Sequence, residues 1–229
     1  MISVMKNIIR KAIQKYYRSK DIIPVTLHNI LNSRHYTLIN EIKTEGKLML
    51  LEQEAFLIAS LVEKTNKISG DAAEVGVFTG GSAKLIRENT DKKLHLFDTF
   101  DGLPDVSSFD NSKQFKEGEY SASLDSVRDY LSKYSSIYFY KGLLQDTSHN
   151  VKDKRFSIVH FDVDLYESTK SCIEFFYPRM NTGGVIISHD YTTAPGVRKA
   201  FDEFFADKKE IVLEMYTTNQ CYVIKCCND

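Results

Sequence analysis

The segment 71–82, DAAEVGVFTGGS, has the residue types of a loop that binds a nucleotide or a related cofactor. Its glycines let the main chain approach a ligand closely, and the free N–H groups of a following helix can bind that ligand. Glu74 stands where the G-x-G-x-x-G fingerprint of dinucleotide-binding folds has its first glycine. An acid at this place favours a cationic or amine-bearing cofactor over a pyrophosphate. The candidate cofactor-binding residues here are Glu74, Gly76, Thr79, Gly80, Gly81 and Ser82.

A second acid, Asp98, closes the next apolar run, KLHLFDTF. It lies roughly 20 residues beyond the glycines, where an acid in doubly wound folds hydrogen-bonds a ribose diol. A glycine loop alone also fits an ordinary strand-to-helix turn. Two acids at neighbouring strand ends favour a cofactor site, to which we also assign Asp98 and Thr99.

Two further apolar runs end in polar side chains that can do chemistry. The segments HFDVD and SHDY contain His160, Asp162, Asp164, His189 and Asp190. Because ligands of open parallel sheets bind outside the carboxyl ends of the strands, we expect these groups to face the cofactor crevice. Carboxylates with an imidazole indicate either a divalent metal site or a general base. Taken singly, Asp190 could cap a turn and His189 could be a buried structural imidazole.

The elements that must position these residues alternate from residue 71 onward. Apolar strand patterns and amphipathic helix patterns follow one another, which predicts a parallel sheet with helices on both faces. Candidate strands are 72–77, 94–100, 137–141, 157–162 and 184–188. Candidate helices are 50–64, 81–88, 124–134, 168–180 and 196–207.

The C-terminal part changes this pattern. Two strand-like runs, 211–216 and 221–226, are separated by only four polar residues, which predicts an antiparallel hairpin. The predicted fold is therefore α/β, with a mostly parallel sheet that ends in an antiparallel hairpin. Such a hairpin is not typical of dinucleotide dehydrogenases.

Composition narrows the function classes. At 229 residues the chain is long enough for one sizeable core, and its net charge of −1 gives no general attraction to nucleic acid. The four cysteines have neither metal-finger spacing nor a disulfide framework, so we expect reduced thiols in a cytoplasmic protein. No apolar run approaches the ~20 residues that span a bilayer, so no transmembrane segment is expected.

The first 20 residues carry six Lys or Arg and no acid, with apolar residues at helical spacing. They predict a basic amphipathic helix, which could lie on an anionic membrane or pack on its own domain or a dimer mate. We favour packing, and expect a homo-oligomer. The predicted division is an N-terminal helical extension over 1–32 and one domain over 33–229.

The segment 101–120 is polar and rich in turn residues, and we interpret it as a mobile lid over the substrate, with a surface loop of no special role as the alternative. Together with 33–50 it is expected to contact the acceptor. Tyrosines that could stack on a sugar ring are Tyr36, Tyr120, Tyr166 and Tyr191.

Five segments in order, AEVGVFTGGSA, LFDTFDGLPD, KGLLQDT, FDVDLYEST and YPRMNTGGVIISHDY, resemble the macrocin O-methyltransferase (TylF/MycF) family of class I S-adenosylmethionine-dependent methyltransferases. The resemblance runs from about Ser33 to the C-terminus. It implies a Rossmann-like sheet of seven strands whose last strand is antiparallel. It also implies methylation of a sugar hydroxyl, with Mg²⁺ required by many members.

The resemblance also implies roles for individual residues. The loop from Glu74 to Ser82 would hold the methionine moiety and Asp98 the ribose. The turn formed by Gly142, Gln145 and Asp146 would lie on the adenine side. Asp162 would be a metal ligand and base beside the cofactor, and the remaining metal ligands would be His189 and Asp190. His189 takes the place of an acid, and imidazole suits softer divalent ions better than Mg²⁺.

The function predicted from the sequence is therefore S-adenosylmethionine-dependent, metal-assisted O-methylation of a sugar hydroxyl in a polysaccharide precursor or secondary metabolite. One alternative is a metal-independent methyltransferase with His189 as base. A second is an NAD-dependent oxidoreductase, which the missing first glycine and the terminal hairpin disfavour. A third is a cofactor-binding scaffold without catalysis.

Overall fold

The computed structural model describes residues 9, 11–13, 15, 16, 33–111 and 113–226. Contacts divide the chain into two compact units, Met1–Ser33 and Arg34–Asp229, and each is described by itself. In the first unit residues 9, 11–13, 15 and 16 are helical, and the rest of the predicted basic helix lies outside the described residues. Among the described residues, no helix combines the length and apolar character needed to cross a membrane.

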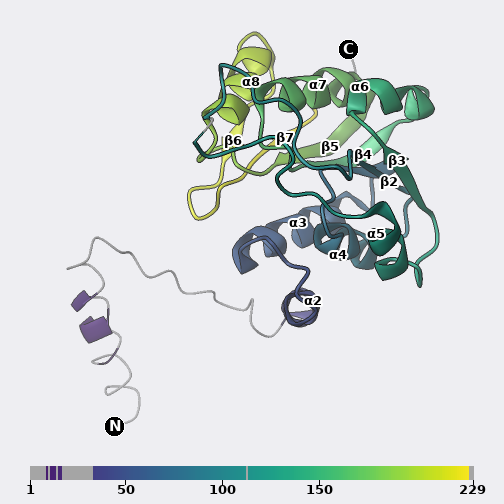
Figure 1. Cartoon of the computed structure of the whole chain (residues 1–229). Coiled ribbons are helices and arrows are strands. Elements are labelled where there is room, and N and C mark those ends of the chain that lie inside the picture. Colours follow the sequence, from purple (N-terminus) through teal and green to yellow (C-terminus); the bar gives the residue numbers. More distant parts are fainter. Residues whose placement is uncertain (1–8, 10, 14, 17–32, 112, 227–229) are drawn as a thin grey trace. The chain divides into compact units, whose positions relative to one another are not determined.

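The second unit is built on a sheet of seven strands among the described residues (Figure 1). The strand order is β3-β2-β1-β4-β5-β7-β6; the first five strands are parallel, and β7 runs antiparallel to both β5 and β6. This confirms the predicted sheet and its terminal hairpin. The strands are β1 (Asp71–Val75), β2 (Leu94–Asp98), β3 (Ile137–Lys141), β4 (Phe156–Phe161), β5 (Met180–Ser188), β6 (Leu213–Glu214) and β7 (Cys221–Ile224).

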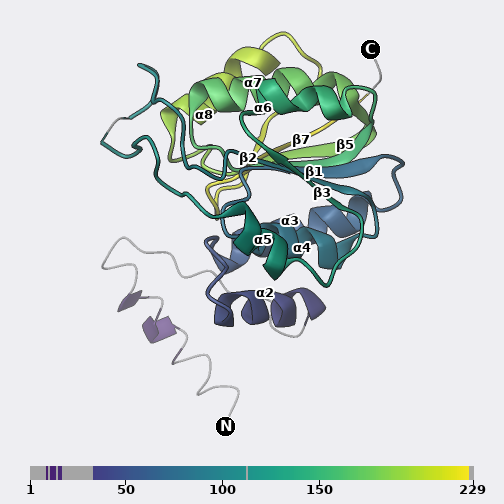
Figure 2. The same cartoon turned by 45° about the vertical axis from the view of Figure 1, so that its right-hand side comes forward.

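Helices cover both faces of the sheet, with α2 to α5 on one face and α6 to α8 on the other (Figure 2). The two faces have separate apolar cores, which explains why all six residues of the central strand β4 are buried. The helices are α2 (Arg34–Thr44), α3 (Glu52–Thr65), α4 (Gly81–Asn89), α5 (Leu124–Tyr130), α6 (Leu144–Thr147), α7 (Tyr166–Phe176) and α8 (Pro195–Phe205), with short 3₁₀ helices η1 (Ser148–Val151) and η2 (Tyr177–Arg179).

The predicted helix over 168–180 is wrong at its C-terminal end. The α-helix stops at Phe176, the 3₁₀ helix η2 with Pro178 follows, and Met180 already begins β5. Proline has no N–H to donate to the preceding turn, so a helix that reaches it cannot continue regularly. Strand β5 consequently starts at Met180, whereas the sequence pattern predicted that it starts at residue 184.

The sheet has a topological switch point between β1 and β4, where the strand order reverses. The two strands approach closely just past their ends, where the Asp162 N–H donates to the Val75 carbonyl at 2.9 Å. Gly76 has φ +85°, and a Cβ atom there would lie 1.8 Å from the carbonyl oxygen of Asp162. Only glycine fits this position, which is also where a ligand crevice is expected.

We expect Gly76→Ala to lower the free energy of unfolding by about 3 kcal/mol or more, because it combines a left-handed backbone with a clash against main chain. The matched control is Gly46→Ala, which also has a positive φ but no atom within 4 Å of the added Cβ. The control should lose only about 1–2 kcal/mol. Urea titration of both variants measures the difference, and equal losses would contradict the close approach of the strands.

Candidate active site

A cavity of about 330 Å³ lies at the carboxyl ends of the parallel strands, within the size range of small-molecule sites. Most of the predicted site residues line it, which brings the glycine loop and the acidic strand ends into one crevice. Glu74, Gly80 and Asp146 do not line it. The lining includes Gly76, Thr79, Gly81, Ser82, Asp98, Thr99, Gly142, Gln145, Asp162, His189 and Asp190.

Asp98 organises the glycine loop. One carboxylate oxygen accepts the N–H groups of Val77 and Phe78 at 2.6 and 2.9 Å, and the other accepts that of Phe100 at 2.6 Å. The Thr99 hydroxyl lies 3.5 Å from that second oxygen but donates to the Gly102 carbonyl at 2.7 Å, so one of the about four lone-pair positions of the carboxylate can still accept a hydroxyl. The predicted ribose contact is therefore compatible with this geometry and stays a prediction.

Glu74 lies inside the sheet rather than at the crevice. It is fully buried and paired across the strands with His160, whose Nδ1 is 2.9 Å from the Glu74 carboxylate. Burial raises the pKa of Glu74, and the contacts with His160 and Ser82 only partly oppose this shift. The structure thus places Glu74 inside the sheet and outside the cavity lining.

The loop after Gly76 packs against the segment that follows α2. Gly80 has φ +88° and caps α4, so it shapes the turn without facing the cavity. A Cβ atom on Gly81 would lie 2.0 Å from the carbonyl oxygen of Lys47. Lys47, Met49 and Leu50 therefore form one wall of the cavity, in the segment expected to contact the acceptor.

The turn after β3 also lines the cavity, through Gly142 and Gln145. The Gly142 N–H donates to the Asp98 carbonyl at 2.9 Å, and Gln145 donates to the Ser171 hydroxyl at 2.8 Å. Asp146 lies outside the lining, and its carbonyl faces the His149 ring. A role for this turn on the adenine side stays a prediction.

The loop 101–120 borders the cavity through Leu103, Gln114, Phe115 and Tyr120. Phe115 is buried in the core, and the predicted mobility of the loop stays a prediction. Among the four tyrosines singled out in the sequence, only Tyr120 lines the cavity. The hydroxyls of Tyr166 and Tyr191 instead donate to Glu203 and Asp202, and Tyr36 is not part of the lining.

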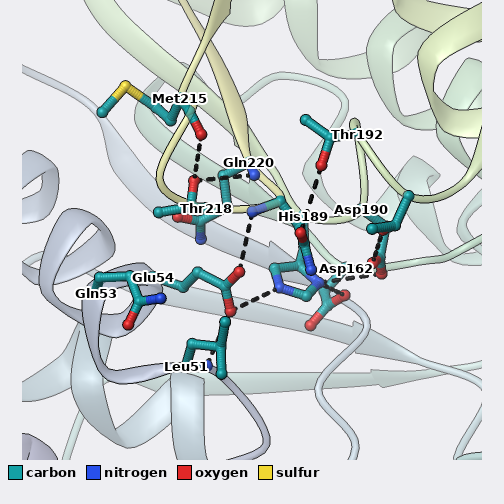
Figure 3. Close-up of polar contacts among 12 residues, drawn as sticks. Leu51, Gln53, Glu54, Asp162, His189, Asp190, Thr192, Met215, Thr218 and Gln220 are labelled. Atoms are coloured by element: carbon teal, nitrogen blue, oxygen red, sulfur yellow. Dashed lines mark hydrogen bonds and ion pairs between the residues drawn. The ribbon is translucent and has the colours of Figure 1, made fainter. Parts of the chain in front are cut away.

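Asp162, His189 and Asp190 form a compact cluster at the ends of β4 and β5 (Figure 3). His189 Nδ1 lies 3.3 Å from an Asp162 oxygen and 3.0 Å from an Asp190 oxygen. The Thr193 hydroxyl donates to the other Asp190 oxygen at 2.8 Å and orients that carboxylate. These three residues were predicted to converge, but the same prediction was wrong for His160, which is fully buried beside Glu74 and does not line the cavity.

Glu54 is a further member of the cluster that sequence reasoning missed. Its carboxylate lies 3.1 Å from His189 Nε2, and the side chain is 1% exposed (Figure 3). Glu54 shares the buried stripe of α3 with Ile58 and Val62. An acid in line with apolar residues at helical spacing was the available signal, because a buried acid needs a partner.

The cluster carries excess negative charge. Burial alone would lower the pKa of His189, but Asp162, Asp190 and Glu54 outweigh burial and raise this pKa far above its usual range. The contact with His189 lowers the pKa of Asp190 against the effect of burial. Burial and the charges of Asp162 and Asp190 raise the pKa of Asp164 to about 9. Three carboxylates thus face one imidazole, an arrangement that attracts a cation.

The donor set fits a divalent ion. Asp162, His189 and Asp190 each offer one ligand atom, and these atoms lie within 4.8 Å of one another. Two ligand atoms at right angles around an ion, with bonds of about 2.1 Å, are separated by about 3.0 Å. The distances from Nδ1 to the two carboxylates are close to this value.

Backbone strain gathers at the cavity. Phe78, Tyr120, Asp164 and Asp190 have φ between +48° and +60° and all line the cavity. Each such conformation costs on the order of 1 kcal/mol or more in a residue with a side chain, and such residues cluster at functional sites. The strain supports the assignment of this cavity as the functional site.

Comparison with known proteins agrees with this assignment. The family model of Macrocin-O-methyltransferase (TylF) matches residues 51–223. The chain is 29% identical over 171 residues to a demethyldecarbamoylnovobiocin O-methyltransferase of Streptomyces niveus, covering 68% of this chain and 65% of the relative. It is 30% identical over 140 residues to an 8-demethyl-8-(2,3-dimethoxy-alpha-L-rhamnosyl)-tetracenomycin-C 4'-O-methyltransferase of Streptomyces olivaceus, covering 54% of each. The match thus spans less than two thirds of either relative.

Solved structures share the fold. The O-methyltransferase NovP is similar with a TM-score of 0.69 and 25% identity, covering 81% of this chain and 88% of that protein. The calicheamicin methyltransferase CalS11 shares the fold with a TM-score of 0.62 and 17% identity, covering 87% and 94%. Since the family match runs through all the strands whose ends form the cavity, the chain belongs to the macrocin-O-methyltransferase (TylF) family.

Proposed function

We propose that this protein is an S-adenosylmethionine-dependent O-methyltransferase that methylates a sugar hydroxyl with the help of a divalent ion. The observation that carries the proposal is the single cavity lined by both the glycine loop with Asp98 and the cluster of Asp162, His189 and Asp190. Family membership supports methyl transfer and makes the oxidoreductase alternative unnecessary. The rhamnosyl group in the name of one relative supports a sugar acceptor.

Different residues along the cavity would bind the cofactor and the divalent ion. The loop from Gly76 to Ser82 and Asp98 would hold the cofactor, whose sulfonium supplies an electrophilic methyl group. The cluster would hold the divalent ion, which favours the ionised form of an alcohol. Positioning of both reactants in one crevice lowers the barrier to an in-line displacement. Asp162, at the end of β4 next to Gly76, lies where both reactants would meet and could accept the hydroxyl proton.

The metal-independent alternative gives His189 the role of general base. That role and metal ligation both need an unprotonated His189 nitrogen, so the effect of removing divalent ions on turnover separates the two mechanisms. The scaffold alternative predicts cofactor binding without turnover. The scaffold alternative is tested by measuring S-adenosylhomocysteine release with a panel of rhamnosides and other deoxyhexosides. Release that requires a sugar supports the proposal.

Asp98→Asn tests the cofactor assignment. Hydrogen bonds to a charged group contribute about 1.5–3 kcal/mol, so we expect affinity for S-adenosylhomocysteine to fall by about 10–100-fold. The matched control is Asp91→Asn in the exposed turn before β2, which should bind normally. Calorimetric titration measures both. Unchanged affinity in folded Asp98→Asn protein would remove Asp98 from the cofactor site.

Asp162→Asn and Asp190→Asn test the metal-assisted step. Each should lower kcat by at least about 100-fold, the usual scale for removing a proton acceptor or charge stabiliser. Removal of divalent ions from the unaltered enzyme with a chelator should have a similar effect, reversed by adding them back. The exposed Asp153→Asn is the control and should retain activity. Full turnover by both variants after chelation would reject the metal mechanism.

A further inference from the structure

We propose that Glu54 is a positioning residue that presents His189 Nδ1 to the two aspartates, and that the resulting site selects a transition-metal ion over Mg²⁺. This inference rests on the metal site of the proposed function and extends it to the identity of the ion. It assigns a role to a residue on α3, which lies outside the strand ends that supply the ligands.

The Glu54 carboxylate is held in place independently of His189. The Leu51 N–H donates to one of its oxygens at 2.8 Å, and the main-chain N–H of Asn219 donates to the other at 3.0 Å. The first contact closes the N-terminal turn of α3, and the second fixes the turn between β6 and β7. With main chain on both sides and almost no exposure, this carboxylate cannot rotate away.

The fixed Glu54 carboxylate lies 3.1 Å from His189 Nε2, while His189 Nδ1 hydrogen-bonds Asp190 at 3.0 Å. Because an ionised carboxylate only accepts hydrogen bonds, Glu54 favours a ring hydrogen on Nε2 when Nδ1 binds an ion. In a neutral ring the lone pair is then on Nδ1, the atom that faces Asp162 and Asp190. Histidines that ligate metals commonly donate their other N–H to a carboxylate in this way.

The donor set determines the preferred ion. Mg²⁺ requires near-ideal octahedral oxygen ligation and dehydrates reluctantly, whereas imidazole suits Zn²⁺ and other first-row transition metals. One nitrogen and two carboxylates therefore favour an ion such as Zn²⁺ or Mn²⁺. Replacing the imidazole by a carboxylate would give three oxygen donors, which is the set that Mg²⁺ prefers.

The test is calorimetric titration of metal-free full-length protein with Zn²⁺, Mn²⁺ and Mg²⁺, without cofactor or acceptor. The unaltered protein should bind Zn²⁺ and Mn²⁺ at least about 10-fold more tightly than Mg²⁺. Glu54→Gln should weaken Zn²⁺ and Mn²⁺ binding by about 10–100-fold, because its amide can donate to Nε2 and disfavour the required tautomer. His189→Asp should weaken Zn²⁺ binding and strengthen Mg²⁺ binding.

Glu63→Gln is the matched control. Glu63 lies on the same helix and its carboxylate contacts another histidine, His35 Nε2, at 2.8 Å, away from the cavity. Its metal affinities should equal those of the unaltered protein. A structural role of Glu54 in capping α3 would lower stability without this change in metal preference, and thermal unfolding of each variant separates the two effects.

A direct readout is the ¹⁵N spectrum of the His189 ring with Zn²⁺ bound. We expect a protonated Nε2 and a metal-bound Nδ1, with this signature absent from His189→Asp. If Glu54→Gln does not fold, this spectrum and the His189→Asp titrations still test whether His189 Nδ1 binds the metal and sets the metal preference. Equal affinity of the unaltered protein for Mg²⁺ and Zn²⁺, unchanged affinities in folded Glu54→Gln, or absence of metal binding would each overturn the inference.

Failure of the inference is distinguishable from failure of the proposed function. Methyl transfer with any divalent ion but no preference for transition metals would reject the role of Glu54 and His189 alone. The expected metal preference without methyl transfer to any sugar would reject the proposed function and leave the metal site intact.

Discussion

The close approach of β1 and β4 at Gly76 and Asp162 is the constraint on which the site depends. A Cβ atom at Gly76 would lie 1.8 Å from the Asp162 carbonyl oxygen, so the two chain segments leave the sheet from adjacent points. The glycine loop starts from one of them and the acidic cluster from the other. Both elements therefore line one crevice, because they leave the sheet at the same edge.

Two histidine–glutamate contacts support this edge, one fully buried and one beside the cavity. Glu74 and His160 pair within the sheet, and Glu54 contacts His189 beside the cavity. An unpaired buried charge is strongly unfavourable, so each acid holds its partner imidazole in a defined orientation. The first contact acts behind the glycine loop and the second at the cluster. Both contacts therefore lie next to the crevice that the strand ends form.

The alternation of strands and helices made the fold and the convergence of Asp98, Asp162 and Asp190 predictable, because parallel strands end at a common edge. The position of Glu74 was less predictable, because β1 ends at Val75 and register pairs Glu74 with His160 inside the sheet. The position of Glu54 at the cluster could not be predicted, because its contact with the main-chain N–H of Asn219 joins residues 165 positions apart. Local patterns identify which residues are unusual, but such long-range contacts arise only from tertiary packing.

We have proposed that a sulfonium cofactor and a cation bind beside each other in one crevice. A crystal structure with S-adenosylhomocysteine and Mn²⁺ tests this, with the ion located by its anomalous scattering. We expect the anomalous peak between Asp162, Asp190 and His189 Nδ1, and the ribose of the nucleoside at Asp98. An ion bound elsewhere, or a nucleoside outside the crevice formed by the glycine loop, would contradict it.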